Sequence, residues 1–264
     1  MTAGGMRPGL LLIAHGSRDE AWVRLVDAAL DRLRAAFPGV PAAAGYLELV
    51  DGRLIPDGVR ELERQGVTDI VAVPLFVSSG STHLDEIAWA LGLKDEPELE
   101  TDLTRVDTAC RVHLCPPMDD HPLIAAIVVE RARALAKDPA REALVLVGHG
   151  SEHPGFRERW ESLLDRLTRH VGQAVGFGAA TYATFHPDTL RDRVAEAAEG
   201  HRVVVVPLFL SAGYFTRTVI PQKLSGLPCT YSGETYLPHE NVYRWLEETA
   251  RQGLAKAAAP SLRG

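Results

Sequence analysis

The sequence predicts an α/β protein built from two similar doubly wound lobes, each with a mainly parallel four-stranded sheet flanked by helices. Three observations lead to this fold class. Two motifs recur in the same order in the two halves of the 264-residue chain. In each half, short runs of Val, Leu and Ile alternate with longer amphipathic segments, which is typical of parallel strands covered by helices on both faces. Hydrophobic residues make up 46% of the chain, enough to fill a core in each lobe.

The internal repeat sets the domain organisation. LLLIAHGSRDE at residues 10–20 resembles LVLVGHGSEHP at 144–154, and VAVPLFVSSGS at 71–81 resembles VVVVPLFLSAG at 203–213. The spacing from the histidine of the first motif to the proline of the second is 59 residues in one half and 58 in the other. Such self-similarity indicates a duplicated domain. We expect an N-terminal lobe at residues 8–140, carrying the active site, and a C-terminal lobe at residues 141–257 with a degenerate site.

The expected elements follow from the apolar patterns. The first half should form strands at 9–14, 41–47, 70–76 and 105–112 and helices at 18–36, 53–66, 83–92 and 121–136. The second half should form strands at 143–148, 175–183, 202–209 and 228–234, with helices between them. The first helix shows the helical spacing well, because six apolar residues fall on one face: Trp22, Leu25, Val26, Ala29, Leu30 and Leu33. Right-handed crossovers then give a doubly wound topology.

Three chemically active side chains follow three strands of the N-terminal lobe. His15 ends the first strand, Glu48 follows the second, and His83 comes three residues after Gly80 at the end of the third. Ligands of open parallel sheets bind beyond the carboxyl ends of the strands, so we expect these three side chains to meet at one rim. Two imidazoles and a carboxylate suit Fe(II), Co(II) or Ni(II). An unprotonated imidazole also accepts a proton near neutral pH.

The C-terminal lobe serves as an internal control. Its three corresponding positions are expected to hold His149, Thr216 and Thr184, the last on the assumption that Tyr46 and Tyr182 correspond. Only one group able to bind a metal survives, which predicts one working site and one degenerate copy. For His149 we favour the structural alternative, a tight turn from strand to helix.

A small-residue loop and two arginines are candidates for contacts with an anionic ligand. The predicted binding residues are Ser78, Ser79, Gly80, Ser81, Arg18 and Arg217. Backbone N–H groups and hydroxyls at the start of a helix can face an anion, and arginines near the rim can pair with carboxylates. The structural alternatives are a plain turn, solvated surface charges and, for Ser17, a helix N-cap.

In order and duplicated, these motifs resemble those of the sirohydrochlorin cobaltochelatases and ferrochelatases, the class II tetrapyrrole chelatases, over residues 9–250. The resemblance implies two chelatase-like lobes that insert Co²⁺ or Fe²⁺, with Ni²⁺ as a further option, into sirohydrochlorin or a related tetrapyrrole for cobalamin or sirohaem biosynthesis. It implies that His15 and His83 hold the metal, that Glu48 acts as a ligand or proton acceptor, and that no organic cofactor is needed.

The resemblance also bears on assembly. Shorter members of the family work as homodimers of one lobe, so this chain is similar to a fused dimer, a monomer acting as a pseudo-dimer with the tetrapyrrole in the cleft between lobes. A further oligomer of the fused chain stays open. The chain departs from the expected pattern after His83, where an Asp-Ile pair is replaced by the run Asp85-Glu86-Ile87. That departure leaves the metal and the exact tetrapyrrole open.

Composition excludes several other classes. A net charge of −7 without a basic segment argues against nucleic-acid binding. Three cysteines without a CxxC pair argue against a disulfide framework and suit the cytoplasm. No apolar run approaches the roughly 18 residues of a membrane span.

The main rival is a non-catalytic protein that carries a tetrapyrrole or a metal, because the same ligands would serve both. A serine hydrolase is disfavoured because neither Ser17 nor Ser151 lies in a G-x-S-x-G elbow. A dinucleotide-binding enzyme is disfavoured because no G-x-G-x-x-G follows a first strand.

Overall fold

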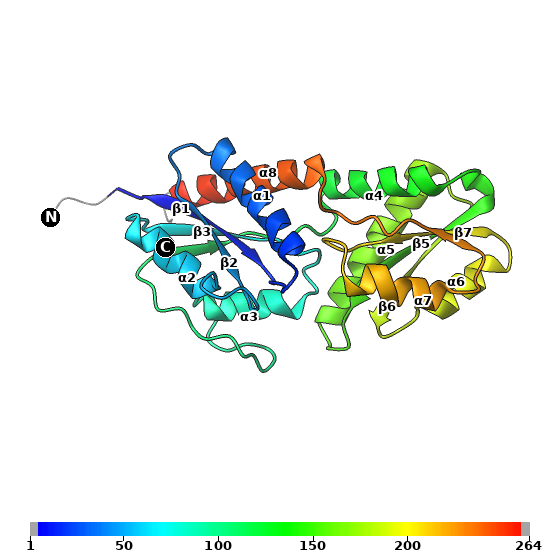
Figure 1. Ribbon diagram of the computed structural model, residues 1–264, viewed down its shortest axis with the longest axis horizontal. Helices are drawn as coiled ribbons and strands as arrows, with labels where there is room; N and C mark the ends of the chain where they lie inside the picture. The colour runs from blue at the N-terminus through cyan, green and yellow to red at the C-terminus, as the bar shows by residue number, and fades with distance from the viewer. Residues whose placement is uncertain (1–4, 260–264) are drawn as a thin grey trace. The chain divides into compact units, whose positions relative to one another are not determined.

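The computed structural model describes residues 5–259, and its contacts divide the chain into two compact units. The first unit comprises the chain up to Phe76, Thr82–Pro117 and the chain from Tyr243 onward. The second comprises Val77–Ser81 and Met118–Val242. Each unit contains one four-stranded sheet with helices on both faces (Figure 1). The predicted fold class is thereby confirmed.

The first unit is a parallel sheet in the order β2-β1-β3-β4. Its elements are β1 (Pro8–Ala14), α1 (Glu20–Ala36), β2 (Ala42–Tyr46), α2 (Ile55–Arg64), β3 (Asp69–Pro74), α3 (Thr82–Ala90), β4 (Arg111–Leu114) and most of α8 (Glu240–Ala258). The central strand β1 is apolar on both faces, because helices cover both. The sequence-based bounds of β1 and of the helices α1 to α3 agree with these to within two residues.

Alternating residues of the first sheet pack against different helices. Leu11 and Ile13 of β1 share a buried cluster with Val59 of α2 and Ile87 of α3. On the other face, Gly253 of α8 packs against Val71 of β3. Figure 1 accordingly shows α2 and α3 on one side of the sheet and α1 and α8 on the other. Both faces of the first sheet are therefore covered by helices.

The second unit repeats the design, with a parallel sheet in the order β6-β5-β7-β8. Its elements are α4 (Pro122–Leu135), the 3₁₀ turn η1 (Pro139–Arg141), β5 (Glu142–Gly150), α5 (Phe156–Val175), β6 (Ala179–His186), α6 (Leu190–Ala198), β7 (Arg202–Pro207), the π-helical turn η2 (Phe215–Val219), α7 (Ile220–Leu224) and β8 (Cys229–Tyr231). The helices α6 and α7 bury one face of the sheet, and α4 and α5 bury the other.

The compact units do not follow the two halves of the sequence. The helix α4 belongs to the first half of the chain but packs on α5 and β7 of the second unit. The helix α8 comes at the end of the second half, yet from Tyr243 onward it belongs to the first unit. Each half of the chain therefore gives one helix to the other unit. The division of the sequence near residue 140 stays a prediction about the repeat.

The fourth strand begins later than its sequence pattern predicts. Instead of a strand at 105–112, the chain runs irregularly to Arg111. The N–H of Val106 donates to the carbonyl of Ala90 at 2.8 Å, and the hydroxyl of Thr108 donates to Glu63 at 2.6 Å. These bonds hold residues 105–110 against the C-terminal ends of α3 and α2. The larger apolar side chains of this segment are therefore partly buried although its backbone does not join the sheet.

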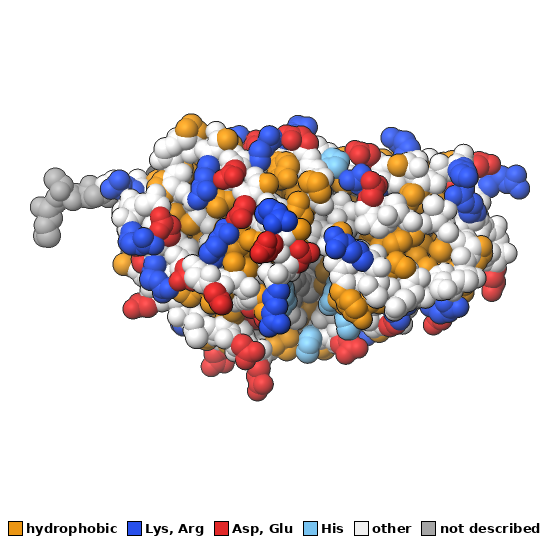
Figure 2. All heavy atoms as spheres, in the orientation of Figure 1, with side chains coloured by type: hydrophobic (Ala, Val, Ile, Leu, Met, Phe, Trp, Pro, Cys, Tyr) orange, Lys and Arg blue, Asp and Glu red, His pale blue; other side chains and the backbone are white. Residues whose placement is uncertain are grey.

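The surface carries charges of both signs. On the face drawn in Figure 2, Lys and Arg side chains alternate with Asp and Glu across the surface, without a continuous basic area. Within residues 5–259, no helix is both long enough and apolar enough to cross a bilayer.

Candidate functional site

The ends of β1 and β2 bring His15 and Glu48 together. The backbone N–H groups of Leu47 and Glu48 both donate to the carbonyl of His15 at 3.1 Å. Gly16 makes this crossing possible, because its φ is +109° and an added Cβ would stand 1.9 Å from the carbonyl oxygen of Glu48. A residue with a side chain cannot occupy that place without moving the backbone. The His-Gly-Ser motif is thus a close crossing of two strand ends.

The His15 ring has its two nitrogens in different surroundings. Its Nδ1 lies 3.2 Å from the carbonyl oxygen of Gly16 and 3.7 Å from Oε1 of Glu48. Both of those oxygens are acceptors, so they favour a proton on Nδ1 and leave Nε2 as the lone-pair atom of a neutral ring. The His15 and Glu48 side chains are 41% and 56% exposed, so solvent and ligands reach both.

His83 completes the predicted trio from the first turn of α3. Its ring centroid lies 4.7 Å from that of His15, with the ring planes at 80°. The ring of Phe76 stands 6.1 Å away on another side and restricts where the imidazole can turn. The strand-end rule therefore places His15, Glu48 and His83 at one rim of the first sheet, as the sequence predicts; their chemical roles stay predictions.

Glu86 is a member of this site that sequence reasoning missed. Its Oε1 lies 3.5 Å from Nδ1 of His83, one helical turn away, although the contact lacks hydrogen-bond alignment and is electrostatic. The neighbouring His83 imidazole holds the pKa of the Glu86 carboxyl below its usual range. The hydroxyl of Thr101 donates to its other oxygen at 3.2 Å. The i, i+3 spacing of His83 and Glu86 on a predicted helix was the available signal.

Glu86 orients the second imidazole as the carbonyl of Gly16 orients the first. A carboxylate beside Nδ1 favours the proton there and leaves the lone pair of a neutral ring on Nε2. Among the described residues, no three His, Cys, Asp or Glu side chains converge closely enough to enclose a metal ion as they stand. Metal binding by the trio stays a prediction.

Three backbone N–H groups of the small-residue loop at residues 78–81 already donate hydrogen bonds within the protein. The N–H of Ser79 donates to Asp119 at 2.7 Å, that of Gly80 to the hydroxyl of Ser78 at 2.9 Å, and that of Ser81 to the carbonyl of Ser78 at 3.1 Å. The expected presentation of backbone N–H groups to an anion is therefore not available here. The contacts favour the plain-turn alternative, and anion binding by the Ser79 and Ser81 hydroxyls stays a prediction.

The two arginines of the prediction lie on different units. Arg18 is exposed in the loop from β1 to α1 and lines a shallow depression with Leu49 and Asp51. Arg217 is exposed on the turn η2 of the second unit. Their contacts with a ligand stay predictions.

The serines of both His-Gly-Ser motifs act locally. Ser17 is not the N-cap of α1; that position is Asp19, whose carboxylate accepts the N–H of Ala21 at 2.8 Å. The hydroxyl of Ser17 accepts the N–H of Asp19, and that of Ser151 accepts the N–H of His153. Both serines stabilise the turn after their strand.

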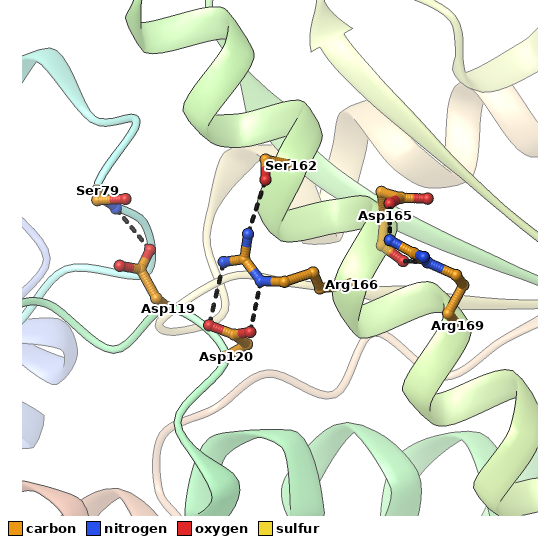
Figure 3. A network of polar contacts seen from close by, with 7 residues as sticks. All are labelled: Ser79, Asp119, Asp120, Ser162, Asp165, Arg166 and Arg169. Carbon is orange, nitrogen blue, oxygen red and sulfur yellow. Dashed lines mark hydrogen bonds and ion pairs between the residues drawn. The ribbon is translucent and has the colours of Figure 1, made fainter.

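The loop before α3 is anchored through a polar network in the second unit (Figure 3). Asp119 accepts the N–H of Ser79, while the next residue, Asp120, forms a two-bond ion pair with Arg166 at 2.6 and 3.1 Å. Arg166 also donates to Ser162 at 2.7 Å. Burial raises the pKa of the Asp119 carboxyl, whereas the Arg166 guanidinium lowers the pKa of Asp120.

Asparagine should replace Asp119 much better than alanine. Asp119 has φ +39°, a region that Asn tolerates, and an amide oxygen can still accept the Ser79 N–H. Alanine loses that acceptor, so Asp119→Ala should lower the free energy of unfolding by about 1–3 kcal/mol more than Asp119→Asn. Urea unfolding at pH 7 measures this difference. Equal losses in both variants would contradict the role of the hydrogen bond.

The difference in stability between the wild type and Asp119→Asn should depend on pH. The folded-state pKa of Asp119 is raised, so the folded protein binds this proton more tightly than the unfolded chain. Wild-type stability should therefore rise relative to Asp119→Asn as pH falls through the folded-state pKa toward the ordinary carboxyl value. Unfolding curves at pH 7 and pH 5 test the sign.

The strand register corrects one equivalence between the two lobes. Ala14, which precedes His15, pairs with Tyr46, and Gly148, which precedes His149, pairs with Thr184. Thr184 therefore corresponds to Tyr46. The assumption that Tyr46 and Tyr182 correspond was wrong by two residues.

The residue in the place of Glu48 is His186, which pairs with Gly150. An added Cβ on Gly150 would stand 2.3 Å from the carbonyl oxygen of His186, repeating the crossing of Gly16 over Glu48. The rings of His149 and His186 lie 4.9 Å apart. The second unit thus keeps two groups able to bind a metal, where the sequence predicted one.

Comparison with known proteins matches this architecture. The CbiX family model matches residues 9–135 and again residues 143–253. A probable sirohydrochlorin cobaltochelatase of Halobacterium salinarum is 30% identical over 173 residues, which are 58% of this chain and 56% of the relative. A sirohydrochlorin cobaltochelatase of Methanococcoides burtonii is 30% identical over 125 residues, 47% of this chain and 93% of that protein. The chain thus spans about half the length of the first relative and nearly all of the second.

Solved structures share the fold across nearly the whole chain. SirB from Bacillus subtilis with Fe³⁺ superposes with a TM-score of 0.74 and 18% identity, covering 96% of this chain and 97% of that one. The sirohydrochlorin chelatase SirB from Bacillus subtilis subspecies spizizenii, in complex with cobalt, gives a TM-score of 0.69 and 20% identity over 95% and 97%. The resemblance drawn from the repeated motifs is confirmed. Because the family model covers most of the sequence in two successive matches, the chain belongs to the CbiX family.

Proposed function

We propose that this chain inserts a divalent first-row metal ion, Co²⁺ or Fe²⁺, into sirohydrochlorin or a closely related tetrapyrrole. The observation that carries the proposal is the pair of imidazoles of His15 and His83, with ring centroids 4.7 Å apart, and the carboxylate of Glu48 3.7 Å from Nδ1 of His15. Relatives named sirohydrochlorin cobaltochelatase, and SirB structures with iron or cobalt, support the choice of substrates.

The spacing of the imidazoles suits one metal ion. An ion about 2.1 Å from each Nε2 lies roughly 3.2 Å from each ring centroid. Two centroids 4.7 Å apart then subtend about 95° at the ion, near the angle of octahedral coordination. The remaining positions are left to water and to the pyrrole nitrogens. Such a partial shell binds the ion without trapping it.

Insertion exchanges one metal ion for two protons of the macrocycle. The ion moves from His15 and His83 to the four pyrrole nitrogens, and the two inner N–H groups lose their protons as the new bonds form. Glu48 accepts one of the two protons on the face where the metal enters and passes it to solvent, to which it is exposed. The second proton goes to an imidazole nitrogen that the departing ion frees, and from there to solvent. Binding energy from the carboxylates of the macrocycle supports the bending of the ring that lets the metal enter.

Turnover distinguishes this proposal from a carrier of tetrapyrroles or metals. The purified protein is incubated anaerobically with sirohydrochlorin and Fe²⁺, Co²⁺ or Ni²⁺, and the macrocycle absorption is followed with the macrocycle in large excess over protein. A chelatase produces many equivalents of metallated product per chain. Product limited to one equivalent per chain, or formed at the rate without protein, would support the carrier instead.

We propose in addition that one chain performs this reaction, because it holds both sheets that a pair of single-lobe chains would supply.

The three cysteines are all free, which supports a reducing, cytoplasmic location.

A further inference from the structure

We propose that the second unit carries its own binding site for a divalent first-row ion, held by His149 and His186. The two residues end the neighbouring strands β5 and β6, at the places that His15 and Glu48 hold in the first unit. Their ring centroids lie 4.9 Å apart, and the ring planes are inclined by 39°. Both ligands come from the second unit, and the proposal does not depend on the insertion reaction.

The distance between the rings matches shared coordination of one ion. With a metal–nitrogen distance of about 2.1 Å, an ion lies roughly 3.2 Å from each centroid. A centroid separation of 4.9 Å then corresponds to about 100° between the two bonds, between the tetrahedral and octahedral angles. The Nδ1 of His149 lies 3.2 Å from the carbonyl of Gly150, which repeats the orientation of His15 and favours Nε2 as the donor toward a metal.

Aromatic side chains form one wall of the pair. The Phe215 ring meets the His149 ring edge to face, with centroids 5.3 Å apart, and Phe185 and Phe209 pack behind Phe215. This wall limits the positions that the His149 ring can take, which lowers the entropy lost when an ion binds. Imidazole donors favour Co²⁺, Ni²⁺, Cu²⁺ and Zn²⁺ over Mg²⁺ and Ca²⁺, which prefer oxygen ligands.

The chemical difference between the two sites is the residue at the second strand. Glu48 offers a carboxylate that accepts a proton, and His186 offers a second neutral donor instead. Position 83 corresponds to Thr216, whose hydroxyl donates to the carbonyl of Gly213 at 3.2 Å and is not directed to a ligand. The second site therefore binds an ion through two imidazoles but lacks the carboxylate proposed to take a pyrrole proton.

Counting bound Co²⁺ tests the site without any tetrapyrrole present. Equilibrium dialysis at pH 7.5, under anaerobic conditions, compares the full chain with the His149→Ala, His186→Ala double variant. We expect the double variant to bind one equivalent fewer than the wild type, and each single variant to weaken that equivalent at least 10-fold. His170→Ala, an exposed histidine on α5, is the matched control and should bind as the wild type does.

The double variant His15→Ala, His83→Ala separates this proposal from the proposed function. Two equivalents in the wild type and one in each double variant support two sites, whereas a single wild-type equivalent that both double variants lose overturns a second site. Loss only in the His149, His186 variant supports the second site while contradicting metal binding at the first. Wild-type stoichiometry and affinity in the His149, His186 variant overturns the second site. The double variant His149→Gln, His186→Gln provides a check on folding. Its circular dichroism spectrum should match that of the wild type while the equivalent of Co²⁺ is still lost, which assigns the loss to the imidazole donors and not to misfolding.

Discussion

Replacing His15 or His83 with alanine is expected to lower the rate of metal insertion by at least about 100-fold while leaving the fold intact. Loss of a residue that only orients a metal ligand typically costs 10- to 100-fold, and loss of the ligand itself should cost at least as much. Neither side chain belongs to the buried core, since both are partly exposed at the strand ends. The insertion rate with Co²⁺ and the thermal unfolding midpoint of each variant measure the two effects.

The matched control is again His170→Ala, which removes an exposed imidazole from a helix of the second unit. It should insert metal at the wild-type rate. Near-wild-type rates in both His15→Ala and His83→Ala would refute the assignment. A large fall in the unfolding midpoint would instead indicate that these histidines stabilise the strand ends.

Gly16→Ala should have the largest effect of any single methyl group added at the strand ends. The new Cβ would stand 1.9 Å from the carbonyl oxygen of Glu48, and the backbone has φ +109°. The crossing must open, which separates His15 from Glu48, so both stability and insertion should fall. We expect a loss of more than about 3 kcal/mol in the free energy of unfolding, the range typical of strained backbone combined with a buried clash.

Gly39→Ala separates the clash from the backbone strain. Gly39 has φ +87°, but nothing lies within 4 Å of its added Cβ. This variant should lose only about 1–2 kcal/mol and keep full insertion activity. Urea unfolding and the insertion assay on both variants give the comparison. Similar losses at the two positions would show that the crossing over Glu48 tolerates a side chain.

The residues that sequence reasoning located best are those tied to strand ends. The run Leu10–Ala14 is buried throughout, so its end was easy to predict, and His15 follows directly. The closeness of His83 to His15 followed from the rule that ligands bind at the carboxyl ends of parallel strands, because β3 lies beside β1. In parallel sheets, the end of a strand fixes the rim on which the next residue lies.

Register was harder to predict than position. The two tyrosines gave the wrong alignment for β6. Tyr46 pairs with the residue directly before His15, whereas Tyr182 pairs with the residue three places before His149. A shift of two residues keeps every side chain on the same face, so the apolar pattern gave no warning. His186 was missed for this reason. Only the hydrogen-bonded pairing of β5 with β6 places it opposite Gly150.

The sequence also did not indicate that α4 and α8 pack on the sheet formed by the other half of the chain. The apolar face of α4 shows that the helix must cover a sheet, but both sheets offer a similar apolar surface. Which sheet it covers depends on the length and path of the chain around Met118, where the second unit resumes. The hydrogen bond that engages the loop at residues 78–81 was hidden for a related reason, since the Asp119 that accepts the Ser79 N–H comes 40 residues later in the sequence.

The position of α8 has a consequence for the order of events on the ribosome. The last residue of the second unit is Val242, whereas the first unit still awaits its covering helix from Tyr243 onward. Nascent chains usually complete their leading domain before the following one is made. In this protein the sheet synthesised first has α1 on one face early, but α8 can pack on that face only after the whole second unit has been made. The first unit therefore completes its packing only after the second unit has been synthesised.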